Sequence, residues 1–259
     1  MKIVRYRTNG DAHYGLLEDD GTIQQLAGSP FESLDVTGER SAADSATLLA
    51  PVASPRLIGV GLNYAAHAEE SNATPPPQPM LFMLPPTAII GPGANIVYPT
   101  QGKVVHYEGE LAVIIGKEAR RVAESEALDY VCGYSCGNDV SERVIQAAEM
   151  ANGCLLIGKG FDTFKPLGPC IVTDLDPSDL QLTTRLNGEV KQDTHTSDLI
   201  FTVPQLISYI SEAVTLLPGD VIMTGTPSGV GPVQPGDVVE IEISGIGTLK
   251  NPVVAESNN

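Results

Sequence analysis

Tryptophan is absent from the 259-residue chain, cysteine occurs only four times, and Lys and Arg together number only 15. Against 32 acidic residues, this shortage of basic residues gives a net charge of −17. Negative charge repels phosphate backbones and anionic lipid, so neither nucleic acid nor a membrane surface is an expected partner. No apolar run approaches the roughly 20 residues of a membrane span, and no apolar signal-peptide core follows the first charged residues. We therefore expect a cytoplasmic protein.

The four cysteines do not form a recognisable metal or redox motif. The only close pair, Cys132 and Cys136, is spaced C-x3-C, and no second pair or histidine follows at zinc-finger spacing. Cys154 and Cys170 lie farther along the chain. We expect all four thiols to be reduced and mostly buried, as is usual for intracellular proteins.

Residues 1–53 are predicted to form a small β domain, and residues 54–259 a larger main domain. The first unit contains three strand-like segments, KIVRYRT, HYGLLED and TIQQL. Turn signals separate them at Asn9-Gly10-Asp11 and at Asp19-Asp20-Gly21. A polar stretch rich in Ala, Ser and Asp, residues 37–47, follows these segments, and Pro51 and Pro55 mark the approximate boundary.

The larger unit is predicted to be mostly β. Short apolar runs recur between frequent Gly and Pro residues, and Asn187-Gly188 is a strong hairpin signal. Only two segments, 140–151 and 203–214, have clear helical spacing of apolar residues. Consecutive prolines within 72–79 exclude regular structure there. The pattern indicates a rolled or barrel-like mixed sheet with few helices.

Two carboxylates precede a strongly apolar strand. Glu108 and Glu110 are two residues apart, so both side chains point to the same face of a strand. The following LAVII run is too apolar for a surface strand. Two carboxylates at the start of a buried strand repel each other unless a proton or cation lies between them. Oxygen ligands select a hard cation such as Mg²⁺, Mn²⁺ or Ca²⁺. The alternative is a solvent-facing strand end.

A third carboxylate stands between a predicted strand and the predicted helix 140–151. If the helix begins near Asp139, then Asp139, Arg143 and Gln146 lie on one helical face. That face would present a metal ligand, a cation for a substrate carboxylate and an amide. The alternative is an N-cap aspartate with a solvated arginine.

Three further segments carry weaker signals. Lys159 lies between glycines, which allow a ligand to approach the ammonium group closely. The Gly-rich segment 224–231 offers backbone N–H groups to an anion but lacks the end of a nucleotide P-loop. His67 and Glu70 meet if their segment is helical, an arrangement that suits a general base activating water. The alternative for 224–231 is a plain tight connection, and that for His67 and Glu70 is an incidental pair on a surface helix, while Lys159 alone is a weak signal.

The motifs occur in an order that resembles the fumarylacetoacetate hydrolase superfamily, from about residue 55 to the C-terminus. The resemblance rests on GLNYAAHAEE, HYEGELAVIIGK, DYVCGYSCGNDVSER, GKGFDTFKPLGP and LPGDVIMTGTPSGVG. It is strongest for the branch of acylpyruvate hydrolases and 2-hydroxyhepta-2,4-diene-1,7-dioate isomerases. It implies a β-rich roll of mixed sheets, preceded by the small N-terminal domain and assembled as a homodimer.

The resemblance also implies a set of site residues. It places the metal ligands at Glu108, Glu110 and Asp139, for Mg²⁺ or Mn²⁺. It places catalytic residues at His67, Glu70 and Lys159, the first two on a mobile lid. It places substrate contacts at Arg143, Gln146, Thr226, Asn63 and Tyr64.

The implied chemistry starts from a small 2-oxo acid whose enolate is stabilised by the metal. The family uses this enolate for C–C hydrolysis of acylpyruvates, for decarboxylation of β-keto acids such as oxaloacetate, and for isomerisation. The His67–Glu70 pair favours hydrolysis of a fumarylpyruvate-like substrate, because that reaction needs an activated water. A phosphoryl hydrolase and a non-enzymatic Ca²⁺-binding module are the competing classes, and the net charge opposes the former.

Overall fold

The computed structural model describes residues 1–8 and 10–257, and short strands make up most of it. The N-terminal strands are β1 (Lys2–Thr8), β2 (Asp11–Leu17), β3 (Thr22–Leu26), β4 (Val36–Ala42) and β5 (Thr47–Leu49). The later strands are β6 (Leu57–Gly61), β7 (Met80–Leu84), β8 (Ile89–Ile90), β9 (Ile96–Tyr98), β10 (Val105–Tyr107), β11 (Gly109–Ile115), β12 (Val131–Asn138), β13 (Ser141–Glu142), β14 (Lys165–Val172), β15 (Gln181–Leu186), β16 (Glu189–His195), β17 (Val221–Met223), β18 (Gly231–Pro232), β19 (Val238–Ile243) and β20 (Gly247–Ala255).

Helices are few and short. The α-helices are α1 (Ala65–Glu70), α2 (Arg143–Ala151), α3 (Ile157–Gly160) and α4 (Val203–Ala213). Single 3-10 segments are η1 (Ala43–Ser45), η2 (Pro86–Ala88), η3 (Glu124–Tyr130), η4 (Pro177–Asp179) and η5 (Thr196–Asp198). No helix within 1–8 and 10–257 is long and apolar enough to cross a membrane.

Three sheets organise these strands. The largest has 12 strands, with the path β4-β3-β2-β1-β14-β12-β11-β17-β6-β7, while β5 adds to β1 and β8 to β14. A five-stranded sheet runs β16-β15-β19-β20-β9, and a three-stranded sheet runs β13-β10-β18. The sheets are mixed, because β6 pairs parallel to β17 and β9 parallel to β20 among mostly antiparallel neighbours. The prediction of a β-rich mixed fold is confirmed.

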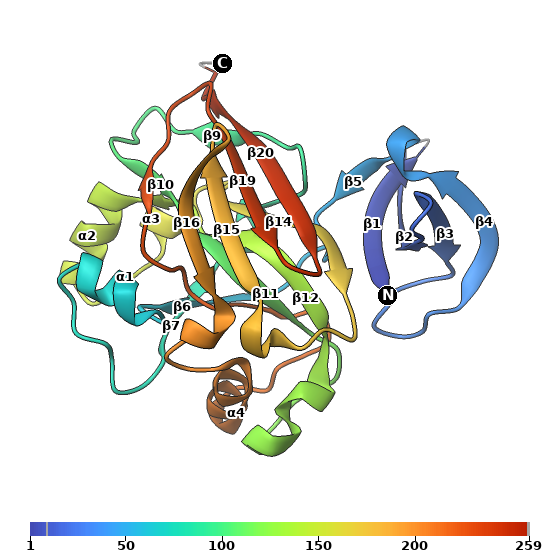
Figure 1. The fold of residues 1–259 in the computed structure, drawn as a ribbon, viewed down its shortest axis with the longest axis horizontal. Helices are drawn as coiled ribbons and strands as arrows, with labels where there is room; N and C mark the ends of the chain where they lie inside the picture. The colour runs from blue at the N-terminus through green and yellow to red at the C-terminus, as the bar shows by residue number, and fades with distance from the viewer. Residues whose placement is uncertain (9, 258–259) are drawn as a thin grey trace.

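The N-terminal strands form a separate lobe, drawn in blue in Figure 1. The lobe is joined to the rest through β1, which pairs antiparallel with β14 and so continues the large sheet. The predicted turn at Asp19-Asp20-Gly21 lies between β2 and β3, whereas the predicted Asn9-Gly10-Asp11 turn includes residue 9, outside the described residues. The polar stretch 37–47, for which no strand was predicted, contains most of β4 and then η1.

Strand β4 escaped prediction for a physical reason. It is the edge strand of the large sheet, and six of its seven residues are exposed. With neither face packed on a core, it shows no alternation of apolar and polar residues.

Helix α4 follows its predicted bounds closely. Thr202 and Gln205 form a capping box at its start, and its buried face includes Leu206, Ile207 and Ile210. The predicted helix 140–151 begins later than expected, at Arg143, because residues 141–142 pair as β13 with β10. Helices α1, α2 and α3 lie together at one side of the larger lobe (Figure 1).

Strand β11 runs through the middle of the larger lobe and is buried at all seven positions. Leu111, Val113 and Ile115 belong to one hydrophobic cluster, while Ala112 and Ile114 belong to a second cluster on the other face. A strand with a core on both faces reads as a continuous apolar run rather than an alternating one. The start of β11 therefore lies deep in the protein, where carboxylates require compensation.

Candidate active site

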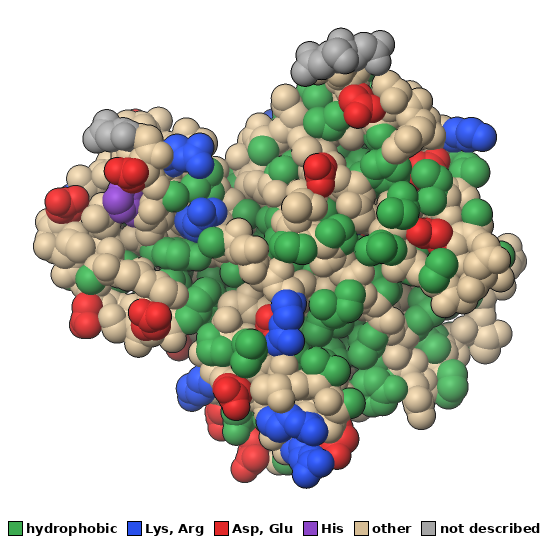
Figure 2. Space-filling model, turned by 180° about the vertical axis from the view of Figure 1, so that it is seen from behind, with side chains coloured by type: hydrophobic (Ala, Val, Ile, Leu, Met, Phe, Trp, Pro, Cys, Tyr) green, Lys and Arg blue, Asp and Glu red, His purple; other side chains and the backbone are tan. Residues whose placement is uncertain are grey.

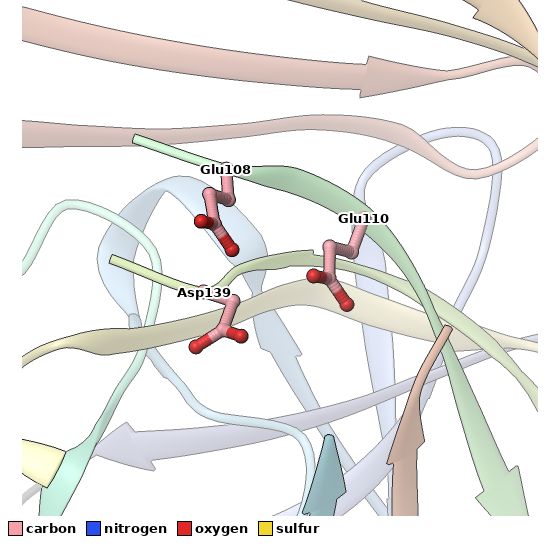
Figure 3. A group of neighbouring side chains, drawn as sticks. All are labelled: Glu108, Glu110 and Asp139. Carbon is pink, nitrogen blue, oxygen red and sulfur yellow. The ribbon is translucent and has the colours of Figure 1, made fainter. Parts of the chain in front are cut away.

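Two glutamates flank Gly109 at the start of β11, and their side chains lie on the same side of the strand (Figure 3). On the other side the Gly109 N–H donates to Gln192 Oε1 at 3.0 Å. A Cβ built on Gly109 would lie 2.1 Å from Thr184 Oγ1 of β15. Glycine at this position therefore allows β15 to approach β11 closely, behind the two glutamates.

Asp139 joins the glutamates from the end of the neighbouring strand. Strand β12 pairs antiparallel with β11, and Asp139 follows its last residue, Asn138. Asn138 Oδ1 accepts the Glu108 N–H at 3.0 Å, and the Asp139 N–H donates to Glu108 O at 2.9 Å. One carboxylate oxygen from each of Glu108, Glu110 and Asp139 lies within 4.8 Å of the others, and all three side chains are buried. Figure 3 shows the carboxylates facing a common space.

The expected helical face of Asp139, Arg143 and Gln146 is not the arrangement found. Asp139 lies before β13, and the N-cap of α2 is Glu142, whose carboxylate accepts the Ile145 N–H at 2.6 Å. Arg143 and Gln146 do share a face of α2, and Arg143 Nη1 donates to Gln146 Oε1 at 2.9 Å. The three residues still meet at one site, because β12 and α2 approach it from different directions.

Three cationic side chains surround the carboxylates. Lys159 Nζ lies 2.7 Å from both Glu108 Oε2 and Asp139 Oδ2, and it donates to Ser141 Oγ at 2.8 Å. Arg143 Nη1 lies 2.7 Å from Glu108 Oε1. Lys165 Nζ lies 2.7 Å from Asp139 Oδ1. Three carboxylates and three cations give the cluster a formal charge of zero.

The two glutamates have opposite electrostatic environments. Burial alone raises the pKa of Glu108, but the charges of Lys159 and Arg143 outweigh it and lower the pKa to about 2. Burial, followed by repulsion from Asp139 and Glu108, raises the pKa of Glu110 well above its ordinary value. Within the described residues, the hydrogen bond that Glu110 accepts comes from the Gly225 N–H, at 2.8 Å.

Lys159 remains an ammonium group in this setting. Burial by itself lowers its pKa, but the carboxylates of Asp139 and Glu108 outweigh burial and raise the pKa above its ordinary value. A permanently charged lysine serves as an electrostatic group and hydrogen-bond donor rather than as an amine nucleophile.

The residues fit a hard divalent cation. Glu110 is buried and lies beside two further carboxylates. Its ionised form therefore needs a cation nearby. A donor set of carboxylate oxygens without Cys or His suits Mg²⁺ or Mn²⁺ rather than zinc. Glu108, Glu110 and Asp139 would hold such an ion.

The carboxylates open onto a cavity of about 310 Å³. Its lining combines the charged and polar site residues with apolar side chains, among them Met80 and Phe82 of β7, Met150 of α2 and Leu155. The predicted site residues on the cavity wall are Glu108, Glu110, Asp139, Lys159, His67, Arg143, Gln146 and Thr226. The sequence prediction therefore identified residues from five separate segments that the fold brings to one cavity.

The His67–Glu70 pair lies at the edge of this cavity. Both residues belong to α1, as predicted, and His67 Nδ1 lies 3.2 Å from Glu70 Oε2. His67 itself lines the cavity, whereas Glu70 lies behind it and does not. Glu70 Oε1 accepts the Gly229 N–H at 3.0 Å. Two N–H groups of the segment 224–231, those of Gly225 and Gly229, thus donate to the protein's own carboxylates, Glu110 and Glu70.

Asn63 and Tyr64 do not line the cavity. The Asn63 amide donates to Phe201 O and Thr224 O and accepts the Phe201 N–H, so it ties three backbone segments together. The Tyr64 side chain is buried, and burial, followed by the charge of Glu110, raises its pKa above its ordinary range. A direct contact of either residue with substrate stays a prediction.

Sequence reasoning missed Lys165 and Gln192. Both are buried, and the Gln192 amide donates to Thr226 Oγ1 at 2.8 Å while its oxygen holds Gly109. Neither was assigned a role, although Lys165 lies within the GKGFDTFKPLGP segment that carries the family resemblance. A lysine inside the FDTFKPLGP run, between aromatic and apolar residues, was the only available signal.

Comparison with known families matches nearly the whole chain. The model described as fumarylacetoacetate (FAA) hydrolase C-terminal matches residues 56–254, and the model described as Rv2993c-like, N-terminal matches residues 1–51. Protein Rv2993c of Mycobacterium tuberculosis is 47% identical over 236 residues, covering 90% of this chain and 88% of that protein. The mitochondrial oxaloacetate tautomerase FAHD2A of Bos taurus is 43% identical over 219 residues, covering 80% and 69% respectively.

Solved structures show the same fold. The 5-carboxymethyl-2-hydroxymuconate delta-isomerase from Mycobacterium smegmatis superposes with a TM-score of 0.92 at 44% identity, covering 99% of this chain and all of that one. The fumarylpyruvate hydrolase from Pseudomonas aeruginosa, solved in complex with Mn²⁺ and pyruvate, superposes with a TM-score of 0.74 at 35% identity, covering 78% and 90%. The chain belongs to the fumarylacetoacetate hydrolase family.

Proposed function

We propose that this protein is a Mg²⁺- or Mn²⁺-dependent enzyme that hydrolyses a C–C bond of an acylpyruvate, a 2-oxo acid of the fumarylpyruvate type. One observation carries the proposal: the three buried carboxylates and His67, oriented by Glu70, face the same cavity. The first group suits a metal that binds a 2-oxo acid, and the second suits activation of water. The Mn²⁺ and pyruvate complex of the fumarylpyruvate hydrolase relative supports the same substrate class.

Charge supports a dianionic intermediate. Glu108, Glu110 and Asp139 are balanced by Arg143, Lys159 and Lys165, so a bound divalent cation leaves an excess of two positive charges. The enolate of a 2-oxo acid carries two negative charges, one on the carboxylate and one on the enolate oxygen. When bound, the cation supplies electrostatic stabilisation of this developing charge.

The chain's own groups supply the remaining steps. Arg143 and Gln146 orient the substrate carboxylate, and the apolar lining around Met80 and Phe82 receives the acyl group. His67 Nε2 takes a proton from water as the water oxygen bonds to the distal carbonyl carbon. The C–C bond to the pyruvate methylene then breaks, releasing a carboxylic acid and the pyruvate enolate. Protonated His67 finally gives its proton to the enolate carbon. This step yields pyruvate and returns His67 to its neutral form.

Isomerisation and decarboxylation are the alternative reactions of the same enolate chemistry. The isomerase and oxaloacetate tautomerase relatives favour isomerisation, and neither isomerisation nor decarboxylation needs an activated water. The paired His67 and Glu70 favour hydrolysis, because hydrolysis is the one reaction of the three that needs a base to activate water. A metal-binding module without enzymatic activity would leave both residues without a function.

The test measures pyruvate released from a synthetic acylpyruvate by the full chain, stripped of metal and then supplied with Mg²⁺ or Mn²⁺. We expect turnover only with metal, and loss of turnover in Glu110→Gln. His67→Asn is expected to bind metal normally but release pyruvate far more slowly. If the metal-loaded protein tautomerises oxaloacetate and releases no pyruvate from acylpyruvates, hydrolysis is excluded and the isomerase function takes its place.

Assembly as a homodimer and a cytoplasmic location stay part of the proposal. Apolar side chains cover much of the larger lobe on the face opposite to that in Figure 1 (Figure 2), which favours association with a second copy. Sedimentation of the purified chain over a range of concentrations measures this directly.

A further inference from the structure

A second lysine, Lys165, is buried behind the carboxylate cluster and has no part in the proposed reaction. It is the first residue of β14, and its side chain is only 1% exposed. Its ammonium group donates to Val140 O at 2.8 Å and to Phe164 O at 3.0 Å. It does not line the cavity, unlike Lys159. A fully buried ammonium group is costly, so its retention calls for a specific partner.

That partner is Asp139. The two oxygens of this carboxylate contact different lysines, since Oδ2 lies 2.7 Å from Lys159 Nζ and Oδ1 lies 2.7 Å from Lys165 Nζ. The Lys165 contact is an ion pair, and Oδ1 has no hydrogen-bond donor among the described residues. Lys159 approaches from the cavity side, where it also holds Glu108 Oε2. Lys165 approaches from the protein interior.

We propose that Lys165 is a positioning residue for the metal site: it fixes Asp139 through Oδ1, so that Oδ2 faces Glu108 and Glu110 as a metal ligand. The two backbone carbonyls hold the ammonium group in place, and the ammonium group prevents rotation of the carboxylate. A metal ligand held in this way needs less ordering when the ion binds. This inference rests on the proposed function, because it assumes that Asp139 is a ligand.

The two lysines are therefore expected to affect metal affinity in opposite directions. Lys159 contacts the same oxygens that would bind the ion, Glu108 Oε2 and Asp139 Oδ2, so it competes with the ion. Of the two Asp139 oxygens, Lys165 contacts Oδ1, whereas Lys159 contacts Oδ2. Removal of positive charge alone would tighten cation binding in both cases. A positioning role of Lys165 predicts the opposite, that cation binding becomes weaker when Lys165 is lost.

The experiment titrates metal-free full-length protein with Mn²⁺ and measures the dissociation constant by calorimetry, without any substrate. We expect Lys165→Met to weaken Mn²⁺ binding by about 10- to 100-fold. We expect Lys159→Met to tighten it by about tenfold. Lys117→Met, at an exposed lysine, is the control for net charge and should leave the affinity unchanged.

Unchanged or tighter Mn²⁺ binding in Lys165→Met overturns the proposal. If that variant does not fold, as judged by circular dichroism, Lys165→Gln provides the same comparison with a polar end group: weaker binding supports positioning, and unchanged or tighter binding overturns it. Failure of the wild-type chain to bind Mn²⁺ would instead contradict the proposed metal-dependent function. The two failures are therefore distinguishable.

Discussion

Glu70 bridges two parts of the cavity edge: its Oε2 lies 3.2 Å from His67 Nδ1, and its Oε1 accepts the Gly229 N–H at 3.0 Å. The first contact fixes the orientation of the imidazole ring and favours a proton on Nδ1. The second contact ties α1 to the Gly-rich segment 224–231. Glu70 thus acts on the reaction through His67, and it also holds the helix that carries His67 against the rest of the site.

This relationship predicts how variants at Glu70 behave. Glu70→Ala removes both contacts, so we expect acylpyruvate hydrolysis to fall by about 100-fold or more, as in the loss of a general base. Glu70→Gln keeps an oxygen for Gly229 but loses the charge beside His67, so its loss should be smaller. Mn²⁺ affinity is expected to survive in both. Glu69→Gln, at the exposed neighbouring position, is the matched control. Wild-type hydrolysis in Glu70→Ala would remove the argument for water activation.

The pH dependence of metal binding follows from Glu110. Burial and the neighbouring carboxylates raise its pKa, so the metal-free protein holds a proton there at pH values where a free glutamate has lost it. The metal must displace this proton, so its affinity should rise with pH until Glu110 ionises without it. Glu108, with its pKa held at about 2, contributes no such proton near neutrality. Calorimetry in buffers of different ionisation enthalpy should detect release of up to one proton per ion.

The same measurement on Glu110→Gln separates this explanation from others. The variant cannot release the proton, so its residual metal binding should lose the pH dependence. Mn²⁺ affinity that is constant between about pH 5 and 8 in the wild-type chain would contradict the assignment of the proton to Glu110.

Residues 64–80 should become more ordered when a ligand binds. This segment carries α1 and then residues 72–79, which form no helix or strand, as their prolines predict. A lid that admits substrate and then excludes water belongs to the less stable parts of a fold. We expect its amides outside the prolines to exchange quickly in the Mg²⁺-bound protein and more slowly with saturating oxalate. Strand β11, buried throughout, is the internal reference. Equal exchange with and without oxalate would mean a rigid wall.

The sequence predicted those parts of the fold whose signal is local. The Asn187-Gly188 turn joins β15 to β16, and the apolar spacing of 203–214 gives α4, because turn chemistry and helical periodicity act within a short stretch of sequence. The edge strand β4 was missed because no core imposes a pattern on it. Helix α3 has four residues, two of them glycine, and it depends on its packing against α2 rather than on its own propensity.

The sequence predicted most residues of the candidate site, but not which strands and helices bring them together. Glu108 and Glu110 were identifiable from period-two spacing beside an apolar run, and Asp139 from its place between a predicted strand and helix, with the family resemblance pointing to the same three residues. Asp139 reaches them through strand pairing between β11 and β12, not through the helical face that was expected. Lys165 was not identified, because a single lysine in a sequence is most often a surface residue. Its burial against Asp139 follows from the pairing of strands far apart in the chain.

The last prediction concerns Gly109, the residue between the two glutamates. An added Cβ would lie 2.1 Å from Thr184 Oγ1 and 3.1 Å from Gln192 Oε1, so Gly109→Ala must push β11 away from β15 or shift both strands. Overpacking of this kind lowers the free energy of unfolding by about 1–3 kcal/mol. It should also weaken Mn²⁺ binding, because Glu108 and Glu110 move with the strand. Gly28→Ala, where an added Cβ meets nothing within 4 Å, is the control.

A second change tests the cause. Thr184 Oγ1 is buried and has no hydrogen-bond partner among the described residues, so Thr184→Ala removes the clashing atom without breaking a hydrogen bond. The double variant Gly109→Ala/Thr184→Ala should therefore recover most of the stability and Mn²⁺ affinity that Gly109→Ala loses, as measured by urea unfolding and metal titration. If the double variant is as impaired as Gly109→Ala, the glycine is required for a reason other than the close approach of β15. Recovery of both quantities together would show that the packing of β15 behind β11 sets the position of the two glutamates.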